Sequence, residues 1–177
     1  MGKLSKGLVQ IYTGEGKGKT TAAFGLAIRA LGHGFRVYII QFMKGKGGYG
    51  ELEGLKRLQP ECQIEHFGAQ GWVHKGENIE EHSLEVHKAF RRAQEIIVSG
   101  EWDIVILDEI LNAIWFELIP ESEVLELLNQ KPPHVELVLT GRNASMAFIE
   151  RADLVTEMVQ RKHPFEQGIM ARLGIEY

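Results

Sequence analysis

Short apolar runs alternate with segments of helical periodicity along this chain. The pattern predicts strands at residues 8–12, 36–42, 63–67, 103–107, 135–140 and 153–159. It predicts helices at residues 21–31, 84–97 and 124–128. Continuous apolar strands suit burial on both faces, so we expect an α/β fold: a mostly parallel sheet of about five or six strands with helices on both faces.

Two glycine-rich segments, residues 43–50 and 68–78, have no regular pattern, and each follows a predicted strand. Ligands of open α/β sheets bind outside the carboxyl ends of the strands, so we expect both segments to lie over a binding site. The chain has no internal repeat or linker, and its 177 residues suit one domain spanning 1–177.

The strongest chemical pattern is a glycine-rich loop between the first predicted strand and the first predicted helix. Its residues are Thr13, Gly14, Glu15, Gly16, Lys17, Gly18, Lys19, Thr20 and Thr21. In this context the backbone of the loop curls so that its N–H groups can donate hydrogen bonds to a phosphate, and the helix N-terminus adds partial positive charge. The Lys19 ammonium would reach phosphate oxygens, and the Thr20 hydroxyl would ligate Mg²⁺. We therefore predict a P-loop in a RecA-like P-loop fold.

This loop departs from the common GxxxxGK[ST] pattern at its first position. Thr13 stands where the first glycine is expected, and a glycine follows one position later. The phosphates would then sit differently from those in other P-loop proteins. A glycine-rich turn that only caps the helix is the alternative interpretation.

Polar residues follow three further predicted strands. Asp108 and Glu109 end an apolar strand in a Walker B-like pattern, and such carboxylates hold a metal directly or through water. They are alternatively polar residues leaving a strand or capping a helix. Lys44 and Arg142 also follow strands and would pair with a triphosphate, unless they are solvated loop charges.

Composition narrows the possible classes of protein. A net charge of −4 and a pI of about 6.0 argue against a nucleic-acid-binding protein. Cys62 is the single cysteine, so an intrachain disulfide is excluded. Without a secretory signal or an apolar run long enough for a bilayer, we expect a cytoplasmic protein with no membrane contact.

The order of these motifs resembles one family nearly end to end, the P-loop ATP:corrinoid adenosyltransferases of the cobalamin pathway. The blocks that carry the resemblance are residues 14–25, 29–34, 41–45, 105–109, 140–142, 162–168 and 173–177. A P-loop alone would be unspecific, whereas these blocks in this order are specific. The family's P-loop carries the same threonine at its first position.

The resemblance implies an activity, its substrates and its partners. The family transfers the 5′-deoxyadenosyl group of ATP to Co(I) of a corrinoid, such as cobalamin or cobinamide, and releases triphosphate. It implies Mg²⁺ or Mn²⁺ as cofactor, a reduced flavoprotein as electron donor, and a homodimer. Lys19 and Arg142 would stabilise the triphosphate charge, and the metal ligands implied are Thr20, Asp108 and Glu109.

One position in the second glycine-rich segment departs from the family. The family's corrinoid-facing loop carries Phe-x-Trp, and here Gln70 stands at the phenylalanine position and Trp72 at the tryptophan position. In the family this aromatic pair displaces the lower axial ligand of cobalt. The resemblance therefore assigns that role to Trp72 alone, or to Phe67 or another aromatic residue.

The residues themselves leave two other functions open. A small P-loop ATPase or kinase would cleave ATP between the β- and γ-phosphates, with Glu109 orienting the attacking water. A nucleotide-binding regulator would bind ATP without turning it over. ADP as product would identify the first, and binding without turnover would identify the second.

Overall fold

A six-stranded, fully parallel sheet forms the centre of the molecule. The computed structural model describes residues 4–45, 49–71, 73 and 79–176. The strands are β1 (Val9–Thr13), β2 (Val37–Gln41), β3 (Cys62–His66), β4 (Ile104–Asp108), β5 (Glu136–Thr140) and β6 (Leu154–Glu157). Their order in the sheet is β3-β2-β4-β5-β1-β6, and each neighbouring pair runs parallel.

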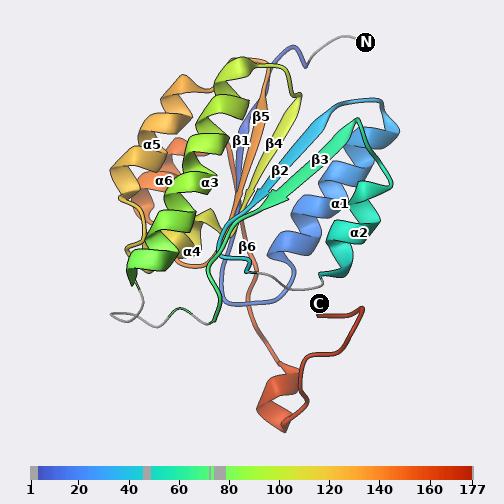
Figure 1. Ribbon diagram of the computed structural model, residues 1–177, viewed down its shortest axis with the longest axis vertical. Coiled ribbons are helices and arrows are strands. Elements are labelled where there is room, and N and C mark those ends of the chain that lie inside the picture. The colour runs from blue at the N-terminus through green and yellow to red at the C-terminus, as the bar shows by residue number, and fades with distance from the viewer. Residues whose placement is uncertain (1–3, 46–48, 72, 74–78, 177) are drawn as a thin grey trace.

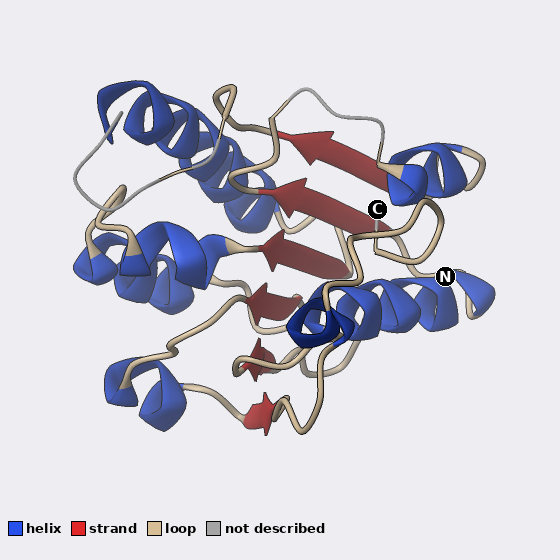
Figure 2. Cartoon of the chain, turned by 90° about the horizontal axis from the view of Figure 1, so that it is seen from below, coloured by secondary structure: helices blue, strands red, loops and turns tan. Residues whose placement is uncertain are grey.

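Helices cover both faces of this sheet. They are α1 (Lys19–Gly32), α2 (Gly50–Lys56), α3 (Ile79–Ser99), α4 (Ile110–Trp115), α5 (Glu121–Gln130) and α6 (Met146–Arg151). Figure 1 shows α1 and α2 on one face and the other four on the opposite face, and Figure 2 shows the strands stacked between the two helical layers. The predicted α/β class and its two helical layers are confirmed.

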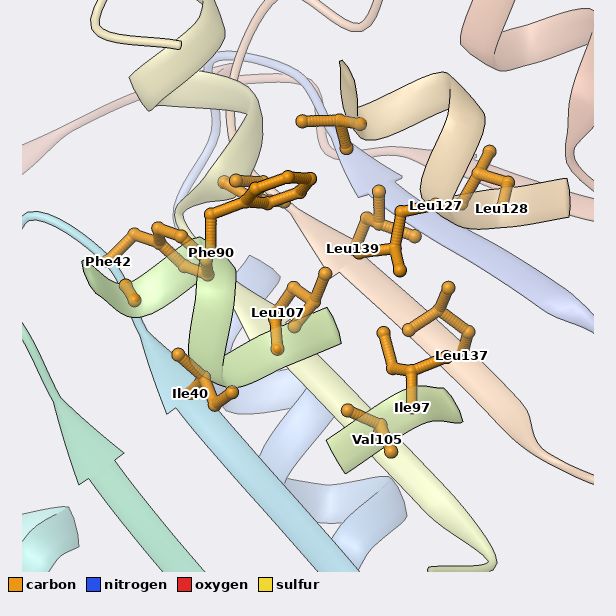
Figure 3. Packing of buried hydrophobic residues seen from close by; sticks show 14 of the residues in the cluster. Ile40, Phe42, Phe90, Ile97, Val105, Leu107, Leu127, Leu128, Leu137 and Leu139 are labelled. Atoms are coloured by element: carbon orange, nitrogen blue, oxygen red, sulfur yellow. The ribbon is translucent and has the colours of Figure 1, made fainter. Parts of the chain in front are cut away.

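Successive residues of the central strands enter two separate cores. In β4, Val105 and Leu107 join the cluster under α3 and α5, shown in Figure 3, while Ile106 joins the cluster under α1. All of them are fully buried. Burial on both sides explains why these strands are apolar at every position instead of alternating with polar residues.

Element boundaries differ from the predicted ones in ways that affect the site. α1 begins at Lys19 instead of residue 21, so Lys19 and Thr20 belong to its first turn. The short helices α2, α4 and α6 were not predicted, because six or seven residues are too few for a clear helical period. Leu84, the first residue of the helix predicted at 84–97, lies within α3, which begins at Ile79, and is 54% exposed.

Length and hydropathy of the helices bear on membrane insertion. Among the residues that the structure describes, no helix is both long enough and apolar enough to cross a bilayer.

A buried tyrosine connects the sheet to α3 away from the candidate site. The Tyr38 hydroxyl on β2 donates to the Glu65 carboxylate on β3 and accepts from Arg92 Nη2 at 2.9 Å. Burial, reinforced by the hydrogen bond to Glu65, raises the pKa of Tyr38 to about 12. The unfolded chain, with an ordinary tyrosine pKa of 10.0, therefore releases this proton at lower pH than the folded chain.

We expect Tyr38→Phe to reduce the loss of stability at alkaline pH. Between pH 10 and 11 the folded wild type retains a proton that the unfolded chain releases, so its free energy of unfolding falls as pH rises. The fall is a fraction of the ~1.4 kcal/mol per pH unit for one fully linked proton. Urea unfolding of both proteins at pH 8, 10 and 11 measures the difference. An identical pH slope in the variant would show that Tyr38 does not carry this linkage.

Candidate nucleotide and metal site

The candidate site lies at the carboxyl ends of the central strands, where the chain makes sharp turns. Three non-glycine residues there have left-handed backbone conformations, namely Met43 (φ 58°) after β2, Glu109 (φ 67°) after β4 and Asn143 (φ 55°) after β5. Side-chain-bearing residues seldom adopt this conformation, and in proteins it concentrates at functional sites. The turns direct the chain away from each strand so that side chains gather at this edge.

The glycine-rich loop is held against the residue that follows β6. Gly16 N–H donates to the Met158 carbonyl at 2.7 Å, and Met158 N–H donates to the Thr13 carbonyl at 2.8 Å. A Cβ atom on Gly14, which has φ 98°, would lie 2.5 Å from that same Met158 oxygen. Glycine is thus required for close approach of two backbones, a reason that the sequence pattern did not reveal.

Lys19 turns back into this loop. Its side chain is 8% exposed, and its ammonium donates to the carbonyls of Gly14 at 2.7 Å and Gly16 at 2.8 Å. Burial lowers the pKa of Lys19 below its ordinary value, while the charge of Glu109 acts in the opposite direction. The loop therefore has a cation at its centre, whereas Thr21 is exposed in the first turn of α1.

Asp108 is fully buried at the end of β4 and accepts three hydrogen bonds from neutral groups. Its Oδ1 accepts from the Thr20 hydroxyl at 2.8 Å and from the Thr140 hydroxyl at 2.7 Å, and its Oδ2 accepts from Gln41 Nε2 at 3.1 Å. Because Thr20 gives its proton to Asp108, the hydroxyl oxygen keeps lone pairs for a cation. Thr140 and Gln41 were not among the predicted site residues.

Glu109 is half-buried beside Asp108 and is fixed through both backbone and side chain. Its N–H donates to Thr140 Oγ1 at 2.9 Å, and its carboxylate accepts a hydrogen bond from the Asn112 side-chain amide. The Asn112 oxygen in turn accepts from the Arg142 backbone N–H at 2.6 Å. Asn112 thus joins the end of β4 to the end of β5.

The charges around Glu109 show that several predicted residues lie in one place. Burial raises the pKa of Glu109, and the negative charge of Asp108 raises it further. Opposing positive charges come from Lys44, Lys19 and Arg142. The structure therefore brings three cations from distant parts of the sequence close to the adjacent carboxylates of Asp108 and Glu109.

Arg142 spans the mouth of the glycine-rich loop. Its guanidinium pairs with the Glu15 carboxylate at 2.7 Å, with both side chains more than half exposed. An exposed pair of this kind contributes little to stability, so Arg142 is readily available to another anion. Gly141, with φ 140°, precedes it, and a Cβ there would lie 2.7 Å from Leu111 Cβ.

We expect Gly141→Ala to destabilise the fold and displace Arg142. The added methyl group would also meet the Asn112 backbone nitrogen at 2.8 Å, in a conformation that non-glycine residues rarely adopt. The free energy of unfolding should fall by about 1–3 kcal/mol. Urea unfolding checks this against Gly54→Ala in α2, where an added Cβ has open space. Equal stability of the two variants would contradict the argument.

A cavity of about 400 Å³ opens above the glycine-rich loop. Its lining comprises Glu15, Gly16, Lys17, Lys19, Arg142, Gln160, His163, Phe165, Glu166 and Glu176. The last five of these residues, from Gln160 onward, belong to the C-terminal segment. In Figure 1 this segment lies at the same edge of the sheet as the glycine-rich loop. Lys17 holds that segment by donating to the Ile175 carbonyl at 3.0 Å and by pairing with Glu176 at 3.2 Å.

The two irregular segments pack against each other through their backbones. Lys44 N–H donates to the Phe67 carbonyl at 2.9 Å, and a Cβ on Gly68 would lie 2.6 Å from the Lys44 backbone. Gln70 is exposed in the same loop. The described part of these segments thus adjoins the site as expected, while Trp72 lies outside the described residues.

The oxygen atoms at the ends of α1 and β4 suit a hard cation. Within the described ranges, no group of three His, Cys, Asp or Glu side chains gathers to form an all-protein metal site. The Thr20 hydroxyl with the Asp108 and Glu109 carboxylates offers oxygen alone. Mg²⁺ and Mn²⁺ prefer such ligands, and Mg²⁺ completes its shell with waters and substrate phosphates. The residues present therefore fit the metal implied by the resemblance.

The parallel sheet, the strand order and the glycine-rich loop leading into α1 define an α/β protein of the P-loop type. The family model described as ATP:corrinoid adenosyltransferase BtuR/CobO/CobP matches residues 5–177. The chain therefore belongs to this family.

Curated relatives agree with this assignment. A corrinoid adenosyltransferase of Sinorhizobium sp is 40% identical over 174 residues, covering 97% of this chain and 81% of that protein. The corrinoid adenosyltransferase of Escherichia coli K12 is 36% identical over 172 residues, covering 97% and 86%. The corrinoid adenosyltransferase CobA of Salmonella typhimurium is 35% identical with the same coverage.

Proposed function

We propose that this protein transfers the 5′-deoxyadenosyl group of ATP to the Co(I) ion of a corrinoid and releases triphosphate. The observation that carries the proposal is membership of the ATP:corrinoid adenosyltransferase family along residues 5–177. The arrangement of Lys19 within its loop and of Thr20 beside Asp108 supports it.

No proton is transferred in this reaction. A cobalt–carbon bond forms at C5′, and the bond from C5′ to the α-phosphate oxygen breaks. Co(I) supplies the electron pair of the new bond, and the triphosphate leaves with the pair of the broken bond. Since the nucleophile has no proton to lose, the protein needs no general base. Its tasks are to align the reacting atoms and to stabilise the leaving charge.

We assign the stabilisation of the triphosphate to the glycine-rich loop and the cations around it. Lys19 and the loop N–H groups of Gly14, Glu15, Lys17, Gly18, Thr20 and Thr21 would face the phosphates, while the Gly16 N–H holds the loop to the Met158 carbonyl. Lys44 and Arg142 would add charge from the ends of β2 and β5. Binding then requires Arg142 to exchange the Glu15 carboxylate for a phosphate, which the exposure of this pair makes easy.

We assign the metal site to Thr20, Asp108 and Glu109. Thr20 and Glu109 would ligate Mg²⁺ or Mn²⁺ directly, and Asp108 would hold the threonine hydroxyl and a metal-bound water. The metal, when bound, neutralises charge on the phosphate oxygens. Burial of the two neighbouring carboxylates favours their neutralisation by a cation, consistent with the raised pKa of Glu109.

The redox step and the assembly remain expectations from the resemblance. We propose that a reduced flavoprotein converts Co(II) to Co(I), and that Trp72, with Gln70 beside it, faces the corrinoid. We further propose a homodimer acting in the cytoplasm. Anaerobic reduction by a reduced flavoprotein and sedimentation of the purified chain test these two points separately.

Two other functions have less support. Cleavage between the β- and γ-phosphates, or regulation by ATP binding alone, would require a chemistry other than that of the matched family. The Asp108–Glu109 pair by itself is compatible with an ATPase, so the reaction products must distinguish an ATPase from an adenosyltransferase.

The test is an anaerobic reaction of the purified protein with chemically reduced Co(I)-cobalamin and MgATP. Light-sensitive adenosylcobalamin and triphosphate should appear in equal amounts. ADP with inorganic phosphate would identify an ATPase or kinase, and ATP that is bound but not consumed would identify a regulator.

A further inference from the structure

Gln41 ends β2 beside the candidate metal site and has an unusual hydrogen-bonding state. Its side chain is fully buried, and it is paired in the sheet with Asp108 on β4. Among the described residues, Gln41 Oε1 is the buried side-chain atom that has no hydrogen-bond partner. Buried acceptors are nearly always satisfied in folded proteins, so this oxygen calls for an explanation.

The orientation of the amide follows from its neighbour. An ionised carboxylate accepts hydrogen bonds but cannot donate them, so the Gln41 NH₂ group must face Asp108 Oδ2, at 3.1 Å. Turning the amide over would place oxygen against oxygen. The atom without a hydrogen-bond partner is therefore the amide oxygen of Gln41, an acceptor that lacks a donor.

We infer that Gln41 is a positioning residue for the metal, with its free amide oxygen accepting a hydrogen bond from a water molecule bound to the cation. Asp108 connects Gln41 to the proposed metal ligand Thr20, because one carboxylate oxygen accepts a hydrogen bond from Thr20 and the other accepts one from Gln41. Metal-bound water is a strong donor and matches the unpartnered oxygen. This inference rests on the proposed function, since it deepens the metal site assigned to Thr20, Asp108 and Glu109.

The inference separates two roles within one side chain. The NH₂ group orients Asp108, and the oxygen orients the hydrated metal. Outer hydrogen-bond partners of this kind typically change metal affinity 10–100-fold when they are removed. Gln41→Met removes both roles with little change in shape, whereas Gln41→Glu, by sharing one proton with the adjacent Asp108 carboxyl group, keeps both a donor to Asp108 and an oxygen acceptor at the same place.

The experiment measures Mn²⁺ binding in the presence of ATP and without corrinoid, using the electron paramagnetic resonance signal of free Mn²⁺. Gln41→Met should weaken Mn²⁺ binding roughly tenfold or more. Gln41→Glu should keep it within about threefold of the wild type. Binding of ATP in EDTA should be the same in all three proteins, because the amide oxygen acts through the metal.

The matched control is Gln10→Met, which breaks a similar amide–carboxylate pair with Glu136 elsewhere in the sheet. It should leave Mn²⁺ affinity unchanged, and thermal unfolding checks that each variant is folded. Unchanged Mn²⁺ affinity in Gln41→Met would overturn the inference while leaving the proposed function intact, and so would equal weakening in both Gln41 variants. A wild type that binds neither ATP nor MnATP would overturn both.

Discussion

Lys19→Ala should lower kcat/KM for ATP by roughly 10²–10³-fold, the range found when one donor that stabilises developing charge is removed. The Lys19 ammonium is buried within the loop and already lies against the carbonyls of Gly14 and Gly16. In the proposed reaction it opposes the charge that develops as triphosphate departs. The measurement is the anaerobic rate of adenosylcobalamin formation over a range of ATP concentrations.

A lysine on the surface of α3 provides the control for this substitution. Lys88 pairs with Glu85 on an exposed helix face, so Lys88→Ala should leave the rate unchanged. Thermal unfolding must show that the Lys19 variant is folded. A folded Lys19→Ala protein with near-normal kcat/KM would remove the glycine-rich loop from the proposed mechanism.

Asp108→Asn should raise the Mg²⁺ concentration required for half-maximal activity by about 10–100-fold. The substitution removes a buried negative charge next to Thr20, the proposed metal ligand. Stability should change little, because the Gln41 amide can turn over and present its oxygen to the new amide. Titrating activity with Mg²⁺ at saturating ATP measures the effect, and urea unfolding measures stability.

Asp103, just before the amino end of β4, supplies the comparison for this second prediction. Its carboxylate accepts from the Arg36 backbone N–H at 2.8 Å, outside the candidate site. Asp103→Asn should leave the Mg²⁺ requirement as it is in the wild type. If Asp108→Asn also left it unaltered, the metal would have to bind elsewhere.

Local sequence was sufficient for the main elements because their signals are local. Short apolar runs identified all six strands of the sheet within one or two residues of their observed ends. The glycine-rich loop was recognisable because its glycines and Lys19 occur between a strand and a helix. Short helices such as α4 and α6 escaped detection, since six residues hold too little periodicity.

The sequence by itself determined the class of fold, the glycine-rich loop and the placement of Asp108 and Arg142 at strand ends. Only the tertiary structure decided what these residues touch. β4 lies between β2 and β5, which brings Gln41 and Thr140 to opposite sides of Asp108. β1 lies beside β6, so Met158 closes on the loop. Strand order depends on packing between distant segments, and no local pattern encodes it.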